Sequence, residues 1–285
     1  MATDLSILRE RAKGIRLIAT DLDRTFLDDE HLVPEENQKA LEACAARGIV
    51  LCAATGRAFS SLPEQVLRIK GMRYLICTNG AQIYDNEAGA LLQERFLSPD
   101  AIRAVWPLLS DPELLIEFFW GGSPYVQRDR YERHEAIPAW FLDYFLASRI
   151  PLEDFAEAVE AHIHEVENVN IVFGSDAVKE RARIFLEAHT DLYELTSSMA
   201  FNFEIGGKGV TKASGLDFLC AREGITPADC LCFGDSENDA RMLAWAGIGV
   251  AVGNAVPETK AAADLVTGDN IHCGVAAALR LLEII

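Results

Sequence analysis

The sequence predicts an α/β protein whose doubly wound parallel sheet is interrupted by an inserted α+β module. Short apolar runs that end in polar residues alternate with helical patterns at both ends of the chain, which is typical of a parallel sheet. Between them, from about residue 85, hairpin and antiparallel patterns take over. We therefore expect a discontinuous core domain of residues 1–84 and 203–285, and an inserted domain of residues 85–202.

The first part of the core shows apolar runs with helical patterns between them. A short amphipathic helix is expected over residues 4–13, ahead of the first run. Pro34 and Gly48 flank the next helical pattern, as expected for the two ends of a helix. Strands are predicted at residues 15–20, 49–54 and 74–77, and helices at residues 35–47 and up to about Arg68.

The inserted segment contains a hairpin signal. Residues 114–120 and 124–127 are strand-like and are joined by Gly121-Gly122. Its other expected elements are helices at residues 99–109, 131–147 and from Ser175 to about residue 189, with strands at residues 168–173, 192–196 and 200–205. The parallel pattern then returns with a helix at residues 211–222, strands at 230–233 and 248–252, and a last helix from near Gly274.

Composition argues against several classes of function. The formal charge of −18 argues against a protein that binds nucleic acid through a basic surface. The uncharged stretch between Arg241 and Glu258 is too short and too rich in glycine to span a membrane. No signal-peptide pattern is visible, and the seven cysteines form no CxxC pair. We expect a cytoplasmic protein with reduced cysteines that binds neither nucleic acid nor membrane.

Two carboxylates follow the first predicted strand. Asp21 and Asp23 are spaced i, i+2, so their side chains start on the same side of an extended chain. In open α/β sheets, ligands bind at the carboxyl edge where these residues lie. Like charges at such short range require a cation or a raised pKa. The pair therefore indicates a ligand site rather than a simple strand end.

The other predicted core strands also end in polar residues, namely Thr55, Asn79 and the segment Asp235-Ser236-Glu237-Asn238-Asp239. Because parallel strands share a carboxyl edge, these groups are expected to lie together. Such oxygen ligands favour Mg²⁺. Lys212 and Lys208 lie near the start of a predicted helix, where an anion is also favoured, although Lys208 fits a solvated loop better. Together these groups indicate a phosphoryl-transfer site.

At these residues the chain resembles the haloacid dehalogenase-like (HAD) hydrolases, and within them the Cof-type phosphatases of subfamily IIB. The four motifs, in the order of the family, are Asp21-Leu22-Asp23-Arg24-Thr25, Thr55-Gly56-Arg57, Gly209-Val210-Thr211-Lys212 and Gly234-Asp235-Ser236-Glu237-Asn238-Asp239. Thr78-Asn79-Gly80-Ala81 and Val252-Gly253-Asn254-Ala255 are also typical of the Cof branch. The resemblance covers nearly the whole chain and implies a Rossmann-like core with an inserted cap. Arg24 stands where glycine is most common in the family, and its role is left open.

The resemblance also implies a role for each motif. Asp21 would be the nucleophile that forms an aspartyl-phosphate. Asp23 would protonate the leaving oxygen and then deprotonate the attacking water. Mg²⁺ would be held by Asp21, the backbone carbonyl of Asp23, and Asp235.

Phosphate and substrate groups would be held by the remaining motif residues. Thr55, with Gly56 beside it, and Lys212 would hold phosphate oxygens. Asn79 and Asn254 would line the mouth of the site, and Asn238 and Asp239 would orient the metal shell or Lys212. The cap would exclude water and choose the leaving group.

The expected function is a Mg²⁺-dependent phosphatase for a small phosphomonoester, such as a sugar phosphate or a phosphorylated cofactor. A phosphomutase or phosphotransferase of the same superfamily is an alternative, and it would release little free phosphate. A signalling module with a phosphorylated aspartate is disfavoured by the residue order and the inserted module. A non-catalytic relative is disfavoured because every catalytic position is intact. The sequence names no substrate and leaves a monomer or a homodimer open.

Overall fold

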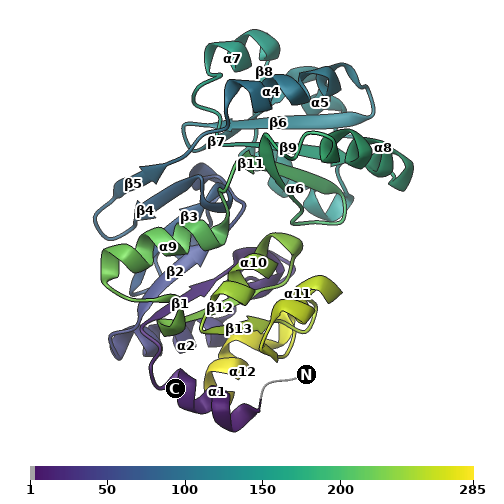
Figure 1. Ribbon diagram of the computed structural model, residues 1–285. Helices are drawn as coiled ribbons and strands as arrows, with labels where there is room; N and C mark the ends of the chain where they lie inside the picture. The colour runs from purple at the N-terminus through teal and green to yellow at the C-terminus, as the bar shows by residue number, and fades with distance from the viewer. Residues whose placement is uncertain (1–3) are drawn as a thin grey trace. The chain divides into compact units, whose positions relative to one another are not determined.

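The protein, described here by a computed structural model of residues 4–285, divides into two compact units. The first unit contains residues 4–56, 62–93 and 211–285. The second contains residues 57–61 and 94–210 (Figure 1). Each unit has its own sheet and its own hydrophobic core.

An eight-stranded sheet forms the centre of the first unit. The strands are β1 (Leu17–Thr20), β2 (Val50–Ala54), β3 (Met72–Cys77), β4 (Gln82–Asp85), β5 (Ala90–Glu94), β12 (Cys230–Gly234), β13 (Ile248–Ala251) and β14 (Leu265–Val266). Their order is β14-β13-β12-β1-β2-β3-β4-β5. Neighbours from β14 to β3 are parallel, and β4 is antiparallel to β3. The predicted doubly wound core is confirmed, with β1 between β2 and β12.

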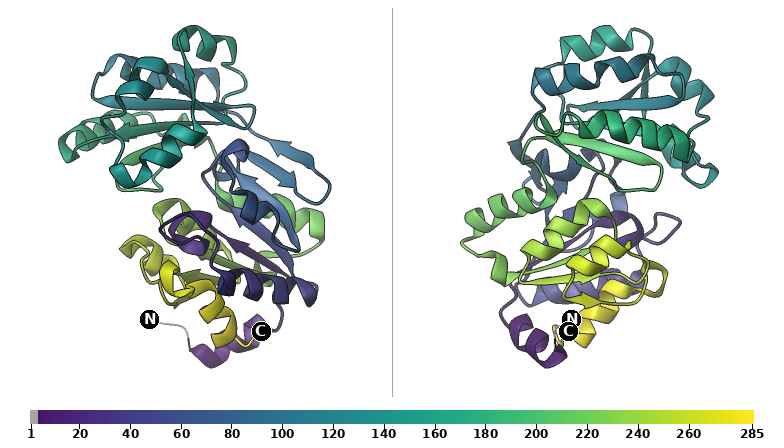
Figure 2. Two further views of the ribbon diagram at one scale, coloured as in Figure 1. Left: turned by 180° about the vertical axis from the view of Figure 1, so that it is seen from behind. Right: turned by 45° about the vertical axis from the view of Figure 1, so that its right-hand side comes forward.

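Helices cover both faces of this sheet. α1 (Leu5–Ala12), α2 (Glu35–Ala46) and α12 (Gly274–Leu281) pack on one face, and α9 (Lys212–Glu223) and α10 (Glu237–Trp245) pack on the other. Two short helices, α3 (Glu64–Leu67) and α11 (Pro257–Ala262), complete the unit. Figure 2 shows these layers of the first unit from two further directions.

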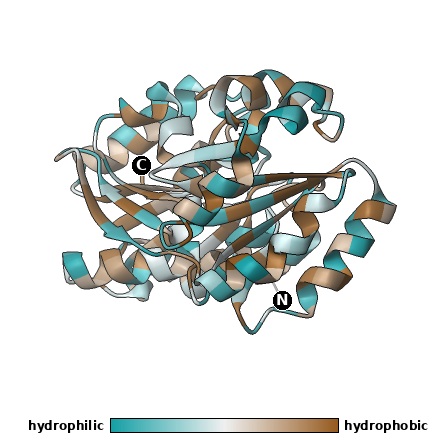
Figure 3. Ribbon diagram, turned by 90° about the horizontal axis from the view of Figure 1, so that it is seen from above, coloured by the Kyte–Doolittle hydropathy of each residue, from teal (hydrophilic) through white to brown (hydrophobic). Residues whose placement is uncertain are grey.

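The layered arrangement explains why the predicted core strands are apolar without alternation. Leu17 and Ala19 of β1 belong to the core under α9 and α10, whereas Ile18 belongs to the core under α1, α2 and α12. A strand that is buried on both faces requires apolar residues at every position. Figure 3, coloured by hydropathy, shows strands of the chain in which hydrophobic residues predominate.

A six-stranded sheet forms the centre of the second unit. Its strands are β6 (Leu114–Trp120), β7 (Ser123–Gln127), β8 (Ile150–Leu152), β9 (Asn168–Phe173), β10 (Tyr193–Thr196) and β11 (Asn202–Gly207), in the order β10-β11-β9-β6-β7-β8. All neighbours are antiparallel except β7 and β8, and the predicted hairpin of β6 and β7 is confirmed. Helices α4 (Pro99–Val105), α7 (Phe155–Ala161) and α8 (Asp176–Glu187) pack on one face, and α5 (Arg128–Arg133) and α6 (Ala139–Ser148) on the other.

The boundaries between the units differ from the predicted boundaries at residues 85 and 202. Strand β5 extends the first sheet, so the first unit continues to residue 93. Strand β11 pairs with β9 and β10, so the second unit continues to residue 210. Residues 57–61 also join the second unit, where Ser60 N donates a hydrogen bond of 3.0 Å to Gly122 O.

Several predicted helices are shorter or divided. The helix expected over residues 131–147 is two helices, because the chain turns at His134, whose φ is 32°, and passes Pro138 before α6 begins. The helix expected up to Arg68 is reduced to α3, which starts only after Pro63. Strands β4, β5, β8 and β14 and helices α7 and α11 were not predicted, and each is at most seven residues long.

A search of residues 4–285 for membrane-spanning helices finds none that is both long and apolar enough to cross a bilayer.

The close contact of Gly80 with Thr211 predicts a specific sensitivity to substitution. Gly80 has a φ of 107°, and a Cβ atom there would lie 2.3 Å from the carbonyl oxygen of Thr211. Gly80→Ala should therefore reduce the free energy of unfolding by about 3 kcal/mol through overpacking and backbone strain. The measurement is urea unfolding at equilibrium.

Gly89→Ala is the matched control. Gly89 also has a positive φ, 62°, but its Cβ position is open. The control should lose only about 1 kcal/mol of backbone strain. Equal losses in the two variants would contradict the steric explanation.

Candidate active site

Acidic side chains from separate parts of the chain meet at the carboxyl edge of the first sheet. Asp21 follows β1, and Asp235 follows β12. Because β1 and β12 are parallel neighbours, with Thr20 opposite Phe233, the two aspartates emerge next to each other. The backbone N–H of Asp21 also donates a hydrogen bond of 3.0 Å to Phe233 O. Asp21 and Asp235 therefore lie together at the carboxyl edge of the sheet, the position that the sequence predicted.

Lys212 is completely buried between two of these carboxylates. Its Nζ atom donates hydrogen bonds to Asp21 Oδ1 at 2.6 Å and to Asp239 Oδ1 at 2.7 Å. The lysine side chain is 0% exposed, so both ion pairs lie out of contact with solvent. Burial alone would lower the pKa of Lys212, but the attraction of Asp21 and Asp239 outweighs burial and raises it. Lys212 therefore stays protonated and is a fixed positive charge beside Asp21.

Asp239 is held in place through its second oxygen. Asp239 Oδ2 accepts hydrogen bonds from the backbone N–H groups of Asp235 at 2.9 Å and Ser236 at 3.1 Å. The bond from Ser236 N is one half of a capping box at the start of α10, and the backbone N–H of Asp239 completes it by donating to the Ser236 side chain. Since its other oxygen bonds Lys212, Asp239 orients the lysine and ties it to the loop that carries Asp235.

Asp235 lies where its negative charge is poorly compensated. Its oxygens accept hydrogen bonds from Thr25 Oγ1 at 3.2 Å and Ser236 Oγ at 3.0 Å. Burial and the repulsion of Asp239 raise the pKa of Asp235 to about 7. Burial, opposed by Lys212 but reinforced by the other two aspartates, also raises the pKa of Asp21 well above its ordinary value.

This cluster fits a hard divalent cation. One ligand oxygen from each of Asp21, Asp235 and Asp239 lies within 4.8 Å of the others, and within residues 4–285 no other such group of histidines, cysteines and carboxylates is found. Oxygen donors are the ligands of Mg²⁺ and Ca²⁺. Burial, together with repulsion from the neighbouring carboxylates, raises the pKa values of Asp21 and Asp235, and a bound cation would offset both effects.

Thr55 and Asn79 lie on neighbouring strand ends, as predicted. Thr55 is buried at the end of β2, with Gly56 directly after it, and its carbonyl oxygen accepts a hydrogen bond of 3.0 Å from Asn79 N. Asn79 has a φ of 55°, and its Oδ1 accepts a hydrogen bond of 3.0 Å from Asn238 Nδ2. The segments that follow β2 and β3 are thus joined to α10 through the hydrogen bond between Asn79 and Asn238.

Asn254 makes hydrogen bonds that were not expected. Its Nδ2 donates to the carbonyl oxygen of Arg24 at 2.7 Å, and its Oδ1 accepts from Asn270 N at 3.0 Å. Asn270 Nδ2 in turn donates to Leu27 O at 3.1 Å. Asn254 therefore fixes the loop after β1. This structural role was not part of the prediction, which placed Asn254 at the mouth of the site.

Three further residues contact the site, and sequence reasoning did not assign them. His31 Nδ1 lies 3.0 Å from Asp23 Oδ1, and Thr25 and Ser236 contact Asp235. Thr25 and Ser236 stand inside the motifs, so their spacing offered a signal. His31 stands alone in a loop, and its contact with Asp23 depends on the fold of that loop.

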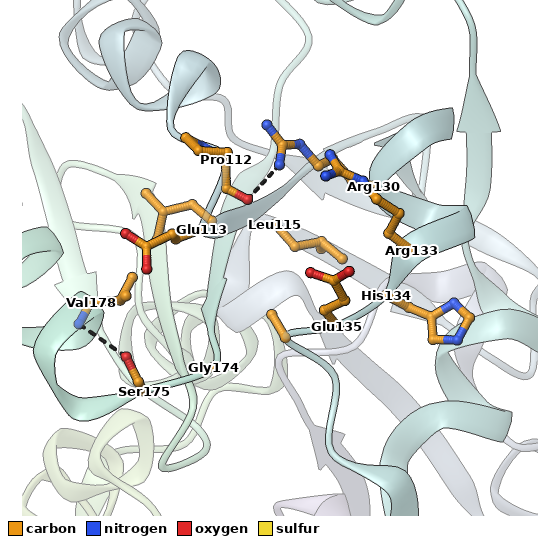
Figure 4. Close-up of a pocket in the computed structure, with 12 residues that line it drawn as sticks. Pro112, Glu113, Leu115, Arg130, Arg133, His134, Glu135, Gly174, Ser175 and Val178 are labelled. Atoms are coloured by element: carbon orange, nitrogen blue, oxygen red, sulfur yellow. Dashed lines mark hydrogen bonds between the residues drawn. The ribbon is translucent and has the colours of Figure 1, made fainter.

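Apart from the acidic cluster, a pocket lies wholly within the second unit (Figure 4). Its volume is about 270 Å³, and its walls include Arg130, Arg133, Glu113 and Ser175. Three of its charged groups are already engaged: Arg130 donates to Pro112 O, Arg133 pairs with Asp129, and Glu113 pairs with Arg181. Ser175 Oγ caps α8 by accepting from Val178 N. These four groups serve the packing of the second unit.

Comparison with known proteins agrees with the geometry of the acidic cluster. The sequence profile of the haloacid dehalogenase-like hydrolases matches residues 18–279. Phosphatase YwpJ of Bacillus subtilis (strain 168) is 31% identical, over 92% of this chain and 98% of its own. The 5-amino-6-(5-phospho-D-ribitylamino)uracil phosphatase YcsE of the same organism is 29% identical, over 97% of this chain and 98% of its own.

A solved structure supports the same assignment. A sugar phosphatase of HAD subclass IIB superposes with a TM-score of 0.80 at 25% sequence identity, and the match covers 95% of this chain and 100% of that one. The family profile spans most of the sequence, and the motifs that carried the predicted resemblance meet at one sheet edge. The chain therefore belongs to the haloacid dehalogenase-like hydrolase family, as a Cof-type phosphatase.

Proposed function

We propose that this enzyme hydrolyses small phosphomonoesters with Mg²⁺ through an aspartyl-phosphate on Asp21. The observation that carries the proposal is the Asp21 carboxylate, which lies at a strand end with a buried lysine on one side and Asp235 on the other. A sugar phosphate or a phosphorylated cofactor precursor is the proposed substrate class. The relatives that act on a phosphorylated ribitylaminouracil and on sugar phosphates support it.

The cation would be held by carboxylate oxygens of Asp21 and Asp235 and by the backbone carbonyl of Asp23. When bound, Mg²⁺ supplies positive charge that reduces the repulsion between the nucleophile and the phosphate. Asp239 completes the cluster but has both oxygens occupied, one by Lys212 and one by backbone N–H groups. We therefore assign Asp239 the orientation of Lys212 rather than direct ligation.

In the first step, an oxygen of Asp21 forms a bond to phosphorus while the ester bond between phosphorus and the leaving oxygen breaks. The leaving oxygen takes the electron pair of that bond and receives a proton from Asp23. Asp23 is partly exposed, and its Oδ1 lies 3.0 Å from His31 Nδ1. The products of this step are a free alcohol and phosphorylated Asp21.

In the second step, water attacks the phosphorus of the phosphorylated Asp21. Asp23, now a carboxylate, accepts a proton from the water, and the bond between phosphorus and Asp21 breaks. Inorganic phosphate and the original Asp21 carboxylate result. One residue thus acts as acid and then as base, which explains why the second carboxylate is needed at this spacing.

Phosphate oxygens would be bound by Lys212 and Thr55, with the backbone at Gly56, while Asn79 and Asn238 position the neighbouring loop. Because the ammonium group is fixed by two carboxylates, little reorganisation is needed when the phosphate arrives. The second unit would select the leaving group and limit the access of water.

Replacing the nucleophile should abolish turnover without unfolding the protein. Asp21→Asn keeps the size of the side chain but removes the charge that attacks phosphorus, so kcat for p-nitrophenyl phosphate should fall at least about a thousandfold. The measurement is steady-state phosphate release, with circular dichroism to verify the fold. Asp191→Asn, at an exposed position in the second unit, is the control for loss of one carboxylate. Turnover of Asp21→Asn at the rate of the control would refute the assignment of the nucleophile.

Metal exchange tests the choice of cation. Excess EDTA should stop hydrolysis, and added Mg²⁺ should restore it, because the carboxylate cluster is otherwise uncompensated. Ca²⁺ should restore less than about a tenth of the rate, since its larger and looser coordination disturbs in-line geometry. Phosphate release in metal-buffered solutions measures both effects. Full activity in EDTA, or equal rates with the two cations, would contradict the proposal.

Metal affinity should depend on pH through Asp235. With a pKa of about 7, this carboxyl binds a proton below neutrality, and Mg²⁺ must displace the proton. The activation constant for Mg²⁺ should weaken about tenfold per pH unit below pH 7 for one displaced proton. Ser236→Ala removes a hydrogen-bond donor that lowers this pKa, so it should move the transition to higher pH. A constant affinity between pH 6 and pH 8 would be evidence against this coupling.

The raised pKa of Asp235 also determines how the stability of the metal-free protein changes with pH. Because the pKa of Asp235 is raised from 3.8 to about 7, the folded protein binds this proton more tightly than the unfolded chain. The stabilisation from this group is complete below pH 3.8 and is lost as the pH rises through about 7. The increase in melting temperature on adding Mg²⁺ should consequently be larger at pH 8 than at pH 5.5.

A further inference from the structure

Arg24 adopts a backbone conformation that an arginine rarely takes. Its φ is 59° and its ψ is 10°, in the left-handed region where residues with a Cβ atom are disfavoured by about 1–2 kcal/mol. Such strain persists only where the surroundings enforce it, and it is concentrated at functional sites. A glycine would satisfy the turn without this cost, so the arginine side chain requires an explanation.

The surroundings hold Arg24 in this conformation from both sides. The carbonyl oxygen of Arg24 accepts a hydrogen bond of 2.7 Å from Asn254 Nδ2. Leu27 N closes the turn by donating to Leu22 O at 2.9 Å. Asn254 is itself fixed by Asn270 N at 3.0 Å. The backbone at Arg24 is therefore built into the loop after β1 and is not a loose surface turn.

The guanidinium group, in contrast, is not used by the protein. Arg24 is exposed, and within residues 4–285 its guanidinium makes no hydrogen bond or ion pair. Its charge nevertheless acts on the cluster: burial and Asp239 raise the pKa of Asp235, and Arg24 is among the groups that oppose this rise. The positive charge of Arg24 therefore acts electrostatically on the Asp235 carboxyl, while its side chain is exposed to solvent.

The other cation of the site, Lys212, has at most one of its three N–H donors left. Lys212 is 0% exposed and already donates to both Asp21 and Asp239. Lys212 can therefore serve one phosphoryl group next to Asp21 but no second anion further out. Arg24 follows Asp23 directly in the chain, and Asp23 is the residue that protonates the leaving oxygen in the proposed reaction. Arg24 is therefore the cation next in the chain to the group that would serve the leaving oxygen.

We propose that Arg24 is a specificity-determining residue that binds a second anionic group, a phosphate or a carboxylate, on the leaving group of the substrate. This inference rests on the proposed phosphatase function and narrows its substrate class to phosphate esters that carry a second anionic group. A planar guanidinium with free donors binds both kinds of oxyanion in a bidentate manner. The strain at Arg24 is the conformational cost of placing that group at this position.

The experiment uses matched pairs of compounds that differ by one anionic group. Glucose 6-phosphate is compared with 6-phosphogluconate for a carboxylate, and fructose 6-phosphate with fructose 1,6-bisphosphate for a phosphate. Each compound is measured as a competitor of p-nitrophenyl phosphate hydrolysis, so that its inhibition constant is obtained whether or not it is turned over. The ratio of inhibition constants within a pair reports recognition of the second anion.

The variants are Arg24→Gln, Arg24→Lys and Arg24→Gly, with Arg68→Gln as the matched control. Arg68 is another exposed arginine of the first unit, paired with Glu64, so its replacement changes the net charge equally. In wild-type enzyme and the control, the compound with the second anionic group should bind about tenfold more tightly than its partner in at least one pair. Arg24→Gln and Arg24→Gly should remove this preference, and Arg24→Lys should retain part of it, because lysine keeps the charge but not the bidentate geometry.

Arg24→Gly adds a second readout. It should raise the midpoint of urea unfolding while it removes the preference for the second anion, because glycine relieves the strain. Loss of the preference in both pairs indicates recognition of either oxyanion, and loss in one pair identifies which one is bound.

Three results would overturn the proposal. Wild-type enzyme that shows no preference within either pair, or Arg24→Gln that keeps it, excludes recognition of a second anion. Equal weakening of both members of a pair, together with weaker activation by Mg²⁺, would assign Arg24 to the electrostatics of the metal cluster instead. Failure of the wild-type enzyme to hydrolyse p-nitrophenyl phosphate or any compound of the pairs would refute the phosphatase function itself, and the inference with it.

Discussion

The buried ion pairs of Lys212 with Asp21 and Asp239 are the interaction on which the rest of the site depends. All three groups are almost completely removed from solvent, with N–O distances of 2.6 and 2.7 Å. Charges in such a place are stable only as a set, because removing one partner of a buried pair costs about 3–5 kcal/mol. The set joins residues that are 191 and 27 positions apart in the chain. Lys212 therefore ties the loop after β1 and the first turn of α10 to the first turn of α9, and the same contacts that stabilise the fold position Asp21, the proposed nucleophile.

This requirement explains how the long insertion is accommodated. The chain leaves the first sheet after β5 and must return so that Lys212 is the first residue of α9. Thr211 caps that helix, and its side-chain oxygen accepts a hydrogen bond of 3.1 Å from Ser214 N. The absence of a side chain at Gly80 lets the loop after β3 approach the Thr211 carbonyl closely. A capping box and one glycine thus fix the point at which the chain returns to the first unit, directly before Lys212.

Local patterns in the sequence were sufficient for the elements that carry Asp21, Thr55, Asn79 and Asp235. These residues follow apolar strands of a parallel sheet, and strand polarity alone places them at one edge. The roles of His31 and Asn254 could not be predicted, because each depends on how a loop folds back on another segment. The division of residues 131–147 and the pairing of β11 with β9 are likewise tertiary outcomes. Sequence patterns predict which groups reach the site, whereas packing decides what each of them contacts.

The charge balance of the cluster connects the metal, the proton and the substrate. Three carboxylates and one ammonium group would leave an excess of two negative charges in a buried place. Burial, with the repulsion between the carboxylates, raises the pKa values of Asp21 and Asp235. A divalent cation removes this excess, so metal binding and proton release are one coupled process. A phosphate ester then brings new negative charge into a protein whose formal net charge is already −18. Lys212 is committed to its carboxylates, so the proposed recognition of a second anion would require a further cation. Arg24 is the exposed cation of the loop after β1, and its strained backbone is the structural reason to assign it that role.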